Sequence, residues 1–172
     1  RDVTKNIKFT NLKMTSSLKY TLNKSAHAIR RSLRKNGARR TEEEINLLRS
    51  ILREIPESKD LPISMRHGIA INASFVEIPK NSTLISEEIS QPDIFITLTG
   101  RLQRSLGEDL ISYSCGDCFG GTDAFGGVCW APSKVVATET SECIHITQRD
   151  LKRLTASLKQ QQEREALIEF LT

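Results

Sequence analysis

Apolar residues recur at three- and four-residue steps in two stretches of the first third of the chain. Between residues 15 and 36 they form one narrow stripe, which indicates an amphipathic helix that an Asn-Gly pair ends. A second stripe follows Thr41, which forms a capping-box pattern with Glu44, and Pro56 ends that helix. Because the connection is short, we expect an antiparallel helical hairpin over residues 15–56. The two stripes consist of Leu18, Leu22, Ala26, Ile29 and Leu33, and of Ile45, Leu48, Ile51, Leu52 and Ile55.

The pattern changes to one typical of strands over residues 63–146. The segments ISMRHGIAINASFVEIP and DIFITLTGRL are rich in β-branched residues and are bounded by Pro, Asn and Gly. Shorter predicted strands are DLISYSC, GVCW, SKVVAT and ECIHIT. Thr147 then begins a last helix over residues 148–171. Its leucine stripe is interrupted by KQQQEREA before LIEFL, so its end could pack on a second copy of the chain.

The order of these elements predicts an α+β fold. It has an N-terminal helical hairpin, a predominantly antiparallel β region with a cysteine-containing glycine-rich loop, and a C-terminal helix. We interpret residues 1–14 as a basic N-terminal arm and residues 15–172 as a single domain.

Charge is distributed very unevenly along the chain. Residues 1–40 contain twelve of the 25 Lys and Arg residues and one acid, a net charge of +11. The other 132 residues contain 13 basic and 20 acidic residues, a net charge of −7. No apolar run approaches the roughly 18 residues that span a bilayer. These features favour an intracellular protein of the cytoplasm or nucleus that binds a polyanion.

Three of the four cysteines lie in the stretch SCGDCFGGTDAFGGVCW, which also holds five of the nine glycines. Two thiolates separated by two residues can bind one tetrahedral zinc ion, and CGDCFGG resembles a zinc knuckle. Cys143 and His145 alternate onto one face of a predicted strand, so either could complete the site. The sequence therefore predicts one structural zinc ion, with ligands drawn from Cys115, Cys118, Cys129, Cys143 and His145.

Two other interpretations of the cysteines remain open. The cysteines could be free thiols in the core, or they could form disulfides. Three N-glycosylation sequons, at Asn23, Asn72 and Asn81, would agree with disulfides, because both features are typical of secreted proteins. GGVCWA resembles the environment of the catalytic cysteine in papain-like peptidases, which implies a cysteine-dependent hydrolase. In that family the cysteine opens a helix, whereas Pro132 and SKVVAT follow here. No other catalytic motif is present, so the sequence favours a protein that is not an enzyme.

One face of the first helix is basic and contains no acid. It lies opposite the apolar stripe and could lie along a phosphate backbone, with an aromatic ring available for stacking. Neutralisation by the acidic remainder of the chain, for example by the three Glu residues at 42–44, is the alternative. The candidate nucleic-acid-binding residues are Tyr20, Lys24, Arg30, Arg31, Arg34, Lys35, Arg39 and Arg40.

Together these patterns predict a zinc-binding accessory or regulatory protein that binds RNA or DNA with little sequence preference. The alternatives are a self-assembling interaction protein, which uses its basic end on an anionic membrane or a genome, and a secreted disulfide-bonded effector. We infer a homo-oligomer through the C-terminal helix and no small-molecule substrate.

Overall fold

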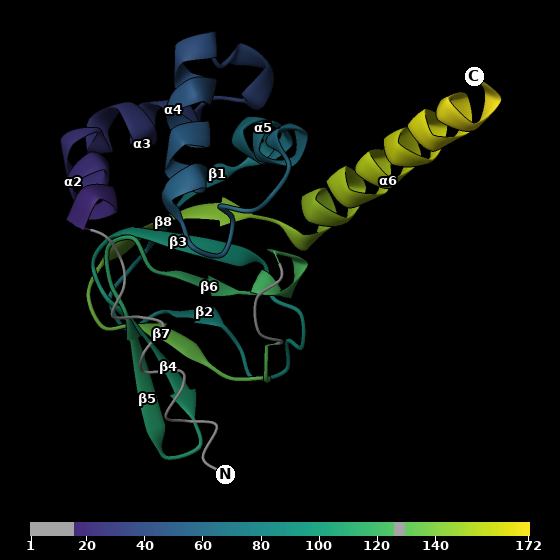
Figure 1. The fold of residues 1–172 in the computed structure, drawn as a ribbon. Coiled ribbons are helices and arrows are strands. Elements are labelled where there is room, and N and C mark those ends of the chain that lie inside the picture. Colours follow the sequence, from purple (N-terminus) through teal and green to yellow (C-terminus); the bar gives the residue numbers. More distant parts are fainter. Residues whose placement is uncertain (1–15, 126–129) are drawn as a thin grey trace.

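A computed structural model describes residues 16–125 and 130–172. Its helices cover one face of two stacked β-sheets (Figure 1). The helices are α2 (Ser16–Lys24), α3 (Ala26–Arg34), the 3-10 helix η2 (Gly37–Arg39), α4 (Glu42–Glu54), α5 (Ile63–Asn72), the 3-10 helix η3 (Thr122–Phe125) and α6 (Gln148–Leu171). The strands are β1 (Ser74–Ile78), β2 (Thr83–Ile85), β3 (Ile94–Thr99), β4 (Leu102–Leu106), β5 (Asp109–Tyr113), β6 (Cys118–Gly120), β7 (Val135–Ala137) and β8 (Ser141–Ile146).

The α+β fold class is confirmed. The helix-side sheet has the strand order β1-β8-β3-β6, and the outer sheet has the order β2-β7-β4-β5. Every strand pairing in the described ranges is antiparallel. The predicted cysteine-containing glycine-rich loop is not confirmed as one loop. Its first part forms β6 and η3, and residues 126–129 lie outside the described residues.

Both N-terminal stripes are buried as their spacing predicts, except for Ala26, which is half-buried. Leu18, Leu22, Ile29 and Leu33 are at most 3% exposed, and Leu48 is 3% exposed. The first helix is divided into α2 and α3 at Ser25, however. The capping box of α4 is confirmed, because the Thr41 hydroxyl accepts from the Glu44 amide and the Glu44 carboxylate accepts from the Thr41 amide.

The strand predicted to begin at Ile63 is wrong, because residues 63–72 form helix α5 and only β1 follows as a strand. Met65 and Ile69 lie four residues apart on its buried side, and Gly68 lets α6 approach closely at Leu154. Packing against α4 and α6 therefore overrides the strand preference of the β-branched residues in this segment.

Two apolar cores lie on opposite faces of the helix-side sheet. The helix-side core packs the helices against alternate residues of β3 and β8, including Ile94, Ile96, Ile144 and Ile146. Ile144 and Ile146 face the helix-side core and Cys143 points to the other side, in agreement with the alternation predicted for this strand. The inner core lies between the two sheets and consists of Ile78, Ile85, Phe95, Leu102, Tyr113, Phe119, Val135, Ala137 and Cys143.

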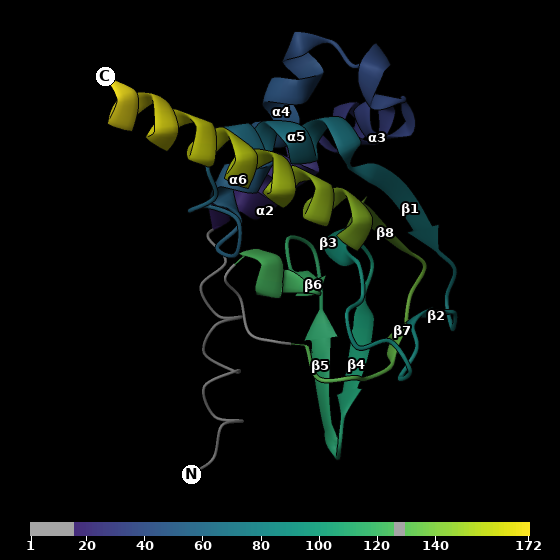
Figure 2. The same ribbon diagram turned by 90° about the vertical axis from the view of Figure 1, so that its right-hand side faces the viewer.

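Helix α6 projects from the body of the molecule (Figure 2). Leu151 in its first turn is 1% exposed, whereas Phe170 near its end is 86% exposed. Residues 159–171, the second half of the helix, are all exposed. None of the helices in the described ranges is both long enough and apolar enough to cross a membrane.

Candidate functional site

A row of stacked rings runs across the space between the two sheets. The ring centres of His145 and Phe95 are 4.9 Å apart and the rings are nearly parallel. Phe95 is followed by Phe119 at 5.6 Å and Phe119 by Tyr113 at 4.4 Å. Offset stacked rings of this kind attract one another and provide flat apolar surface. The inner face of the fold is therefore aromatic from β8 to β5.

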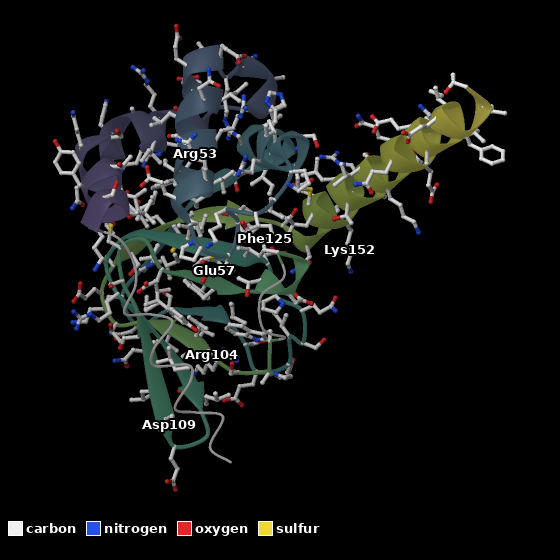
Figure 3. The ribbon with its side chains drawn as sticks, viewed as in Figure 1. Arg53, Glu57, Arg104, Asp109, Phe125 and Lys152 are labelled. Atoms are coloured by element: carbon white, nitrogen blue, oxygen red, sulfur yellow. The ribbon has the colours of Figure 1, made fainter. Side chains whose placement is uncertain are left out.

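Arg104 brings a charge to this apolar inner face. It lies two residues after the buried Leu102 on β4, so both side chains point between the sheets, and its register partners are Ile111 and Val135. Its Nε donates to the Ser133 hydroxyl at 2.5 Å. Figure 3 shows Arg104 among the strands, well away from the helical layer.

The Arg104 guanidinium also stacks on Trp130, with its central carbon 3.6 Å from the ring centre. One Nη2 hydrogen bond to the Ala131 carbonyl, at 2.9 Å, fixes the guanidinium against this segment. The guanidinium is close enough to Tyr113 to oppose the rise in the pKa of its hydroxyl that burial causes. No carboxylate in the described ranges forms an ion pair with Arg104.

Asp93 connects the inner face to the start of α6. Its Oδ2 lies 2.7 Å from Nε2 of His145, and its Oδ1 accepts from the Gln148 amide at 2.8 Å. The Gln148 side chain donates to the carbonyls of Pro92 at 2.9 Å and Gly121 at 3.1 Å. One carboxylate and one amide thus join β3, β8, the turn after β6 and the first residue of α6.

The two glycines after Phe119 permit this close packing. Gly120 has a φ of +99°, a conformation that favours glycine. A Cβ atom on Gly120 would collide with the Asp93 carbonyl, and one on Gly121 would collide with the Gln148 amide. The close approach of three backbone segments explains why this turn needs glycine.

The predicted zinc site is wrong. Cys118 packs against the helix-side core and Cys143 lies in the inner core, so the helix-side sheet separates the two thiols. His145 is on the Cys143 side, where it contacts Asp93, and Cys129 lies outside the described residues. Among residues 16–125 and 130–172, no three His, Cys, Asp or Glu side chains come together in a group that could hold a metal ion.

The cysteines that the structure describes are buried or half-buried free thiols. Burial raises the pKa of Cys118 well above its ordinary value, and the nearby carboxyls of Glu57 and Asp117 raise it further. Burial also raises the pKa of Cys143 to about 12 and that of Cys115 above 9.0. These environments favour the neutral thiol rather than the thiolate that binds zinc.

Much of the predicted basic face is neutralised within the chain. Arg30 forms two hydrogen bonds with the Glu142 carboxylate, at 2.6 and 2.7 Å. Lys35 contacts Glu44 at 2.6 Å, and Arg31 lies 3.9 Å from the same carboxylate. These three cations therefore form ion pairs with carboxylates of α4 and β8. Neutralisation by the chain's own acids, including one of the Glu residues at 42–44, accounts for these three residues.

The other candidate nucleic-acid-binding residues have different environments. Arg34 lies over the Phe75 ring at 4.6 Å, and Lys24 lies 5.8 Å from the centre of the exposed Tyr20 ring. Arg39 is exposed in η2. Arg40 is buried and donates to six backbone carbonyls, so it is unavailable to a phosphate. Arg40 is therefore not part of an exposed basic surface.

Sequence reasoning missed the residues that the structure brings together. Arg104, Trp130, Asp93 and Gln148 were not among the candidate site residues. The signal at Arg104 was the alternation in LQRSL, which places a charge on the same face as the apolar Leu102. No local pattern indicates that Asp93 and Gln148 are bonded, because they are 55 residues apart.

Solved structures with the same arrangement are regulatory domains. CBD2 of PKAR with bound Sp-2Cl-cAMPS has a TM-score of 0.52 and 18% sequence identity, over 78% of this chain and 90% of that one. The regulatory domain of Toxoplasma gondii PKA with cAMP has a TM-score of 0.51 and 16% sequence identity, over 72% of this chain and 50% of that one. This chain has their fold. Neither a protein-family model nor a curated protein sequence matches it.

A third similar structure is the guanosine-bound regulatory subunit of a cAMP-independent protein kinase A from Trypanosoma cruzi. Its TM-score is 0.52 and its identity 14%, over 66% of this chain and 42% of the subunit. This chain thus corresponds to half or less of the length of the Toxoplasma and Trypanosoma proteins.

These findings overturn the function predicted from the sequence. The predicted zinc protein that binds RNA or DNA is wrong, because the similar structures are regulatory domains with small bound molecules and the described ranges contain no zinc-binding group. The predicted partners are wrong for the same reason. They comprised nucleic acid, an anionic membrane and a second copy of the chain, and they excluded a small-molecule ligand.

Proposed function

We propose that this chain is a regulatory domain that binds a small nucleotide-class molecule between its two sheets. The observation that carries the proposal is the shared fold with domains that hold cAMP, a cAMP analogue and guanosine. These three molecules have in common a purine ring attached to a ribose. The likeness extends over 66–78% of the chain.

The inner face supports this class of ligand. Ligand sites in proteins are mostly apolar and aromatic, with a few polar groups that fix orientation. The row of His145, Phe95, Phe119 and Tyr113 makes the interior between the sheets aromatic. Arg104 at the Trp130 side and the Asp93–His145 pair at the other end of the row are the polar groups.

The attachment of α6 supports a regulatory role. The first residue of this helix is bonded to the turn that follows Phe119, and only the first turns of the helix pack on the body. A ligand that moves this turn would therefore act directly on the base of a long exposed helix. Such an element can have two positions whose balance the ligand changes.

Calorimetry with cAMP, AMP, adenosine and guanosine tests the proposal. We expect saturable binding of at least one of them, and a ligand at 100 times its Kd should stabilise the fold by about 2.7 kcal/mol. Binding should also change the emission of Trp130, the only tryptophan in the chain. If none of the four molecules produces heat or raises the unfolding temperature at millimolar concentration, the proposed function is wrong.

A further inference from the structure

A cation and an N–H donor lie together at one end of the inner face, and no carboxylate in the part of the chain that the structure describes pairs with either of them. Arg104 points between the sheets and forms no ion pair with a carboxylate of the described ranges. Its hydrogen bonds go to a hydroxyl and a backbone carbonyl, both of which are neutral. A half-buried guanidinium in such surroundings attracts an anion more strongly than one in bulk water does.

The indole of Trp130 adds an unsatisfied donor. Its Nε1 is buried and has no hydrogen-bond partner among residues 16–125 and 130–172. An indole N–H can only donate, and buried polar groups are almost always paired. The indole ring lies directly under the Arg104 guanidinium, 3.6 Å from its central carbon. An acceptor group that contacts one of these donors is therefore close to the other.

We propose that Arg104 and Trp130 form an anion anchor, which binds the phosphate or carboxylate group of the ligand. This inference rests on the proposed function, because it assigns one chemical group of the molecule that binds between the sheets. Arg104 supplies the charge and a planar pair of donors, a geometry that suits phosphate and carboxylate oxygens. Trp130 supplies the second donor and the surface on which the guanidinium lies.

The surrounding residues hold the anchor in position before a ligand arrives. Ser133 and Ala131 fix two sides of the guanidinium through hydrogen bonds at 2.5 and 2.9 Å. Ser133 is itself buried, and its hydroxyl donates to the Ala131 carbonyl at 3.0 Å. A side chain that is already held loses little conformational entropy when it binds. The anchor therefore selects anionic nucleotides over the corresponding nucleosides.

The experiment compares cAMP with adenosine, which lacks the phosphate, and uses inorganic phosphate as the minimal probe. Calorimetry measures the binding of cAMP and adenosine to the full chain. The fluorescence of Trp130 measures the binding of phosphate. Arg104→Gln removes the charge, and Trp130→Phe keeps a ring but removes the N–H donor. Arg101→Gln is the matched control, because Arg101 is an exposed arginine next to the same strand.

We expect the wild type to bind cAMP more tightly than it binds adenosine, by a factor of about ten or more. Arg104→Gln should lower the affinity for cAMP by a factor of about ten or more. Adenosine affinity should change little in Arg104→Gln. Trp130→Phe should weaken cAMP by a smaller factor, and Arg101→Gln should behave as the wild type. Phosphate should change Trp130 emission saturably in the wild type but not in Arg104→Gln. Far-UV circular dichroism verifies that each variant is folded, and Arg104→Lys, which keeps the charge, should retain part of the preference for cAMP.

Each contrary outcome separates the two proposals. Equal affinity for cAMP and adenosine, unchanged in Arg104→Gln, overturns the anchor and leaves the proposed function in place. A saturable phosphate effect that depends on Arg104, without binding of any nucleotide, supports the anchor and overturns the proposed function. The absence of any response to phosphate, cAMP and adenosine overturns both.

Discussion

Arg40 has a structural role that its charge alone does not suggest. Its guanidinium lies between the C-terminal ends of α3 and α5, where the last carbonyls of a helix generally have no partner within the helix, although the Ser32 carbonyl also accepts from the Lys35 amide. It also carries a positive charge at the negative ends of two helix dipoles. Burial lowers the pKa of Arg40, and Glu44 opposes this effect. The carbonyls that accept from it belong to Ser32, Leu33, Lys35, Ala70, Ile71 and Ala73.

Replacement of Arg40 should therefore destabilise the protein strongly. Arg40→Met keeps much of the volume but leaves these buried carbonyls unpaired, which should lower the free energy of unfolding by about 3 kcal/mol or more. Arg39→Met is the matched control, because Arg39 is exposed, and it should change stability by no more than about 0.5 kcal/mol. Urea unfolding of the three proteins measures the difference. Equal stability of both variants would show that Arg40 is not a cap.

The Arg30–Glu142 pair links a helix to the helix-side sheet. The Arg30 hydrogen bonds lower the pKa of the Glu142 carboxyl most, burial opposes this, and the Thr99 hydroxyl lowers it further. A carboxyl whose pKa is lower in the folded state than its ordinary value near 4.5 stabilises the fold above that value. That contribution is lost as the pH falls through the lowered pKa of the folded state.

The difference in stability between the wild type and Glu142→Gln should accordingly depend on pH. At pH 7 the variant should be less stable by about 1–2 kcal/mol, and the difference should shrink as the pH falls below about 4.5. Glu139→Gln serves as the control, since Glu139 is exposed in the same part of the chain. Denaturant unfolding at a series of pH values measures both. A difference that is constant from pH 7 to pH 3 would contradict the role given to the pair.

Among the elements, α6 has the most uneven environment. It is 24 residues long, or about 36 Å at 1.5 Å per residue, and the contacts that hold it are at its first turns. Leu151 is buried there and Leu154 packs on Gly68 of α5. Gln148 adds the bonds to Pro92 and Gly121. A small rotation at this base therefore produces a large displacement at the exposed end.

Removal of the Gln148 side chain should loosen this base without unfolding the protein. In Gln148→Ala we expect faster amide hydrogen exchange in the Gly120–Gly121 turn and in the first turn of α6, because two hydrogen bonds are lost. Peptides from the outer sheet should exchange as in the wild type. Gln160→Ala, in the exposed middle of the same helix, is the control. If the two variants give identical exchange at the turn, Gln148 does not hold it.

At the scale of the whole molecule, the helix-side sheet is shared by two cores. One face of β3 and β8 packs on the helices, and the other faces the space between the sheets. Alternate residues of one strand therefore connect the inner face to the helical layer across a single backbone. A change in the inner packing of Phe95 or His145 reaches neighbours such as Ile94 and Ile144 through rigid, closely packed contacts. This arrangement suits a domain that reports on what lies between its sheets.

The sequence by itself determined the features that depend on neighbours a few residues apart. The apolar stripes of the first helices, the Thr41–Glu44 capping box and the alternation in β8 follow from helix and strand geometry. The α+β class follows from their order. These predictions held because each local preference agrees with the final packing. Residues 63–72 are the exception, since their β-branched side chains favoured a strand whereas contacts with α4 and α6 favoured a helix.

Only the tertiary structure decided which side chains meet. Cys118 and Cys143 lie on opposite faces of one sheet, a separation that their spacing in the sequence does not show. Arg30 is paired with Glu142, which is 112 residues away, so a face that looked uniformly basic is partly neutral. Periodicity shows which face of its own helix or strand a residue lies on. It does not show which residue of another element lies opposite that face and pairs with it. The predicted zinc ion and nucleic-acid partner were therefore wrong, and the contact of Arg104 with Trp130 could not be predicted.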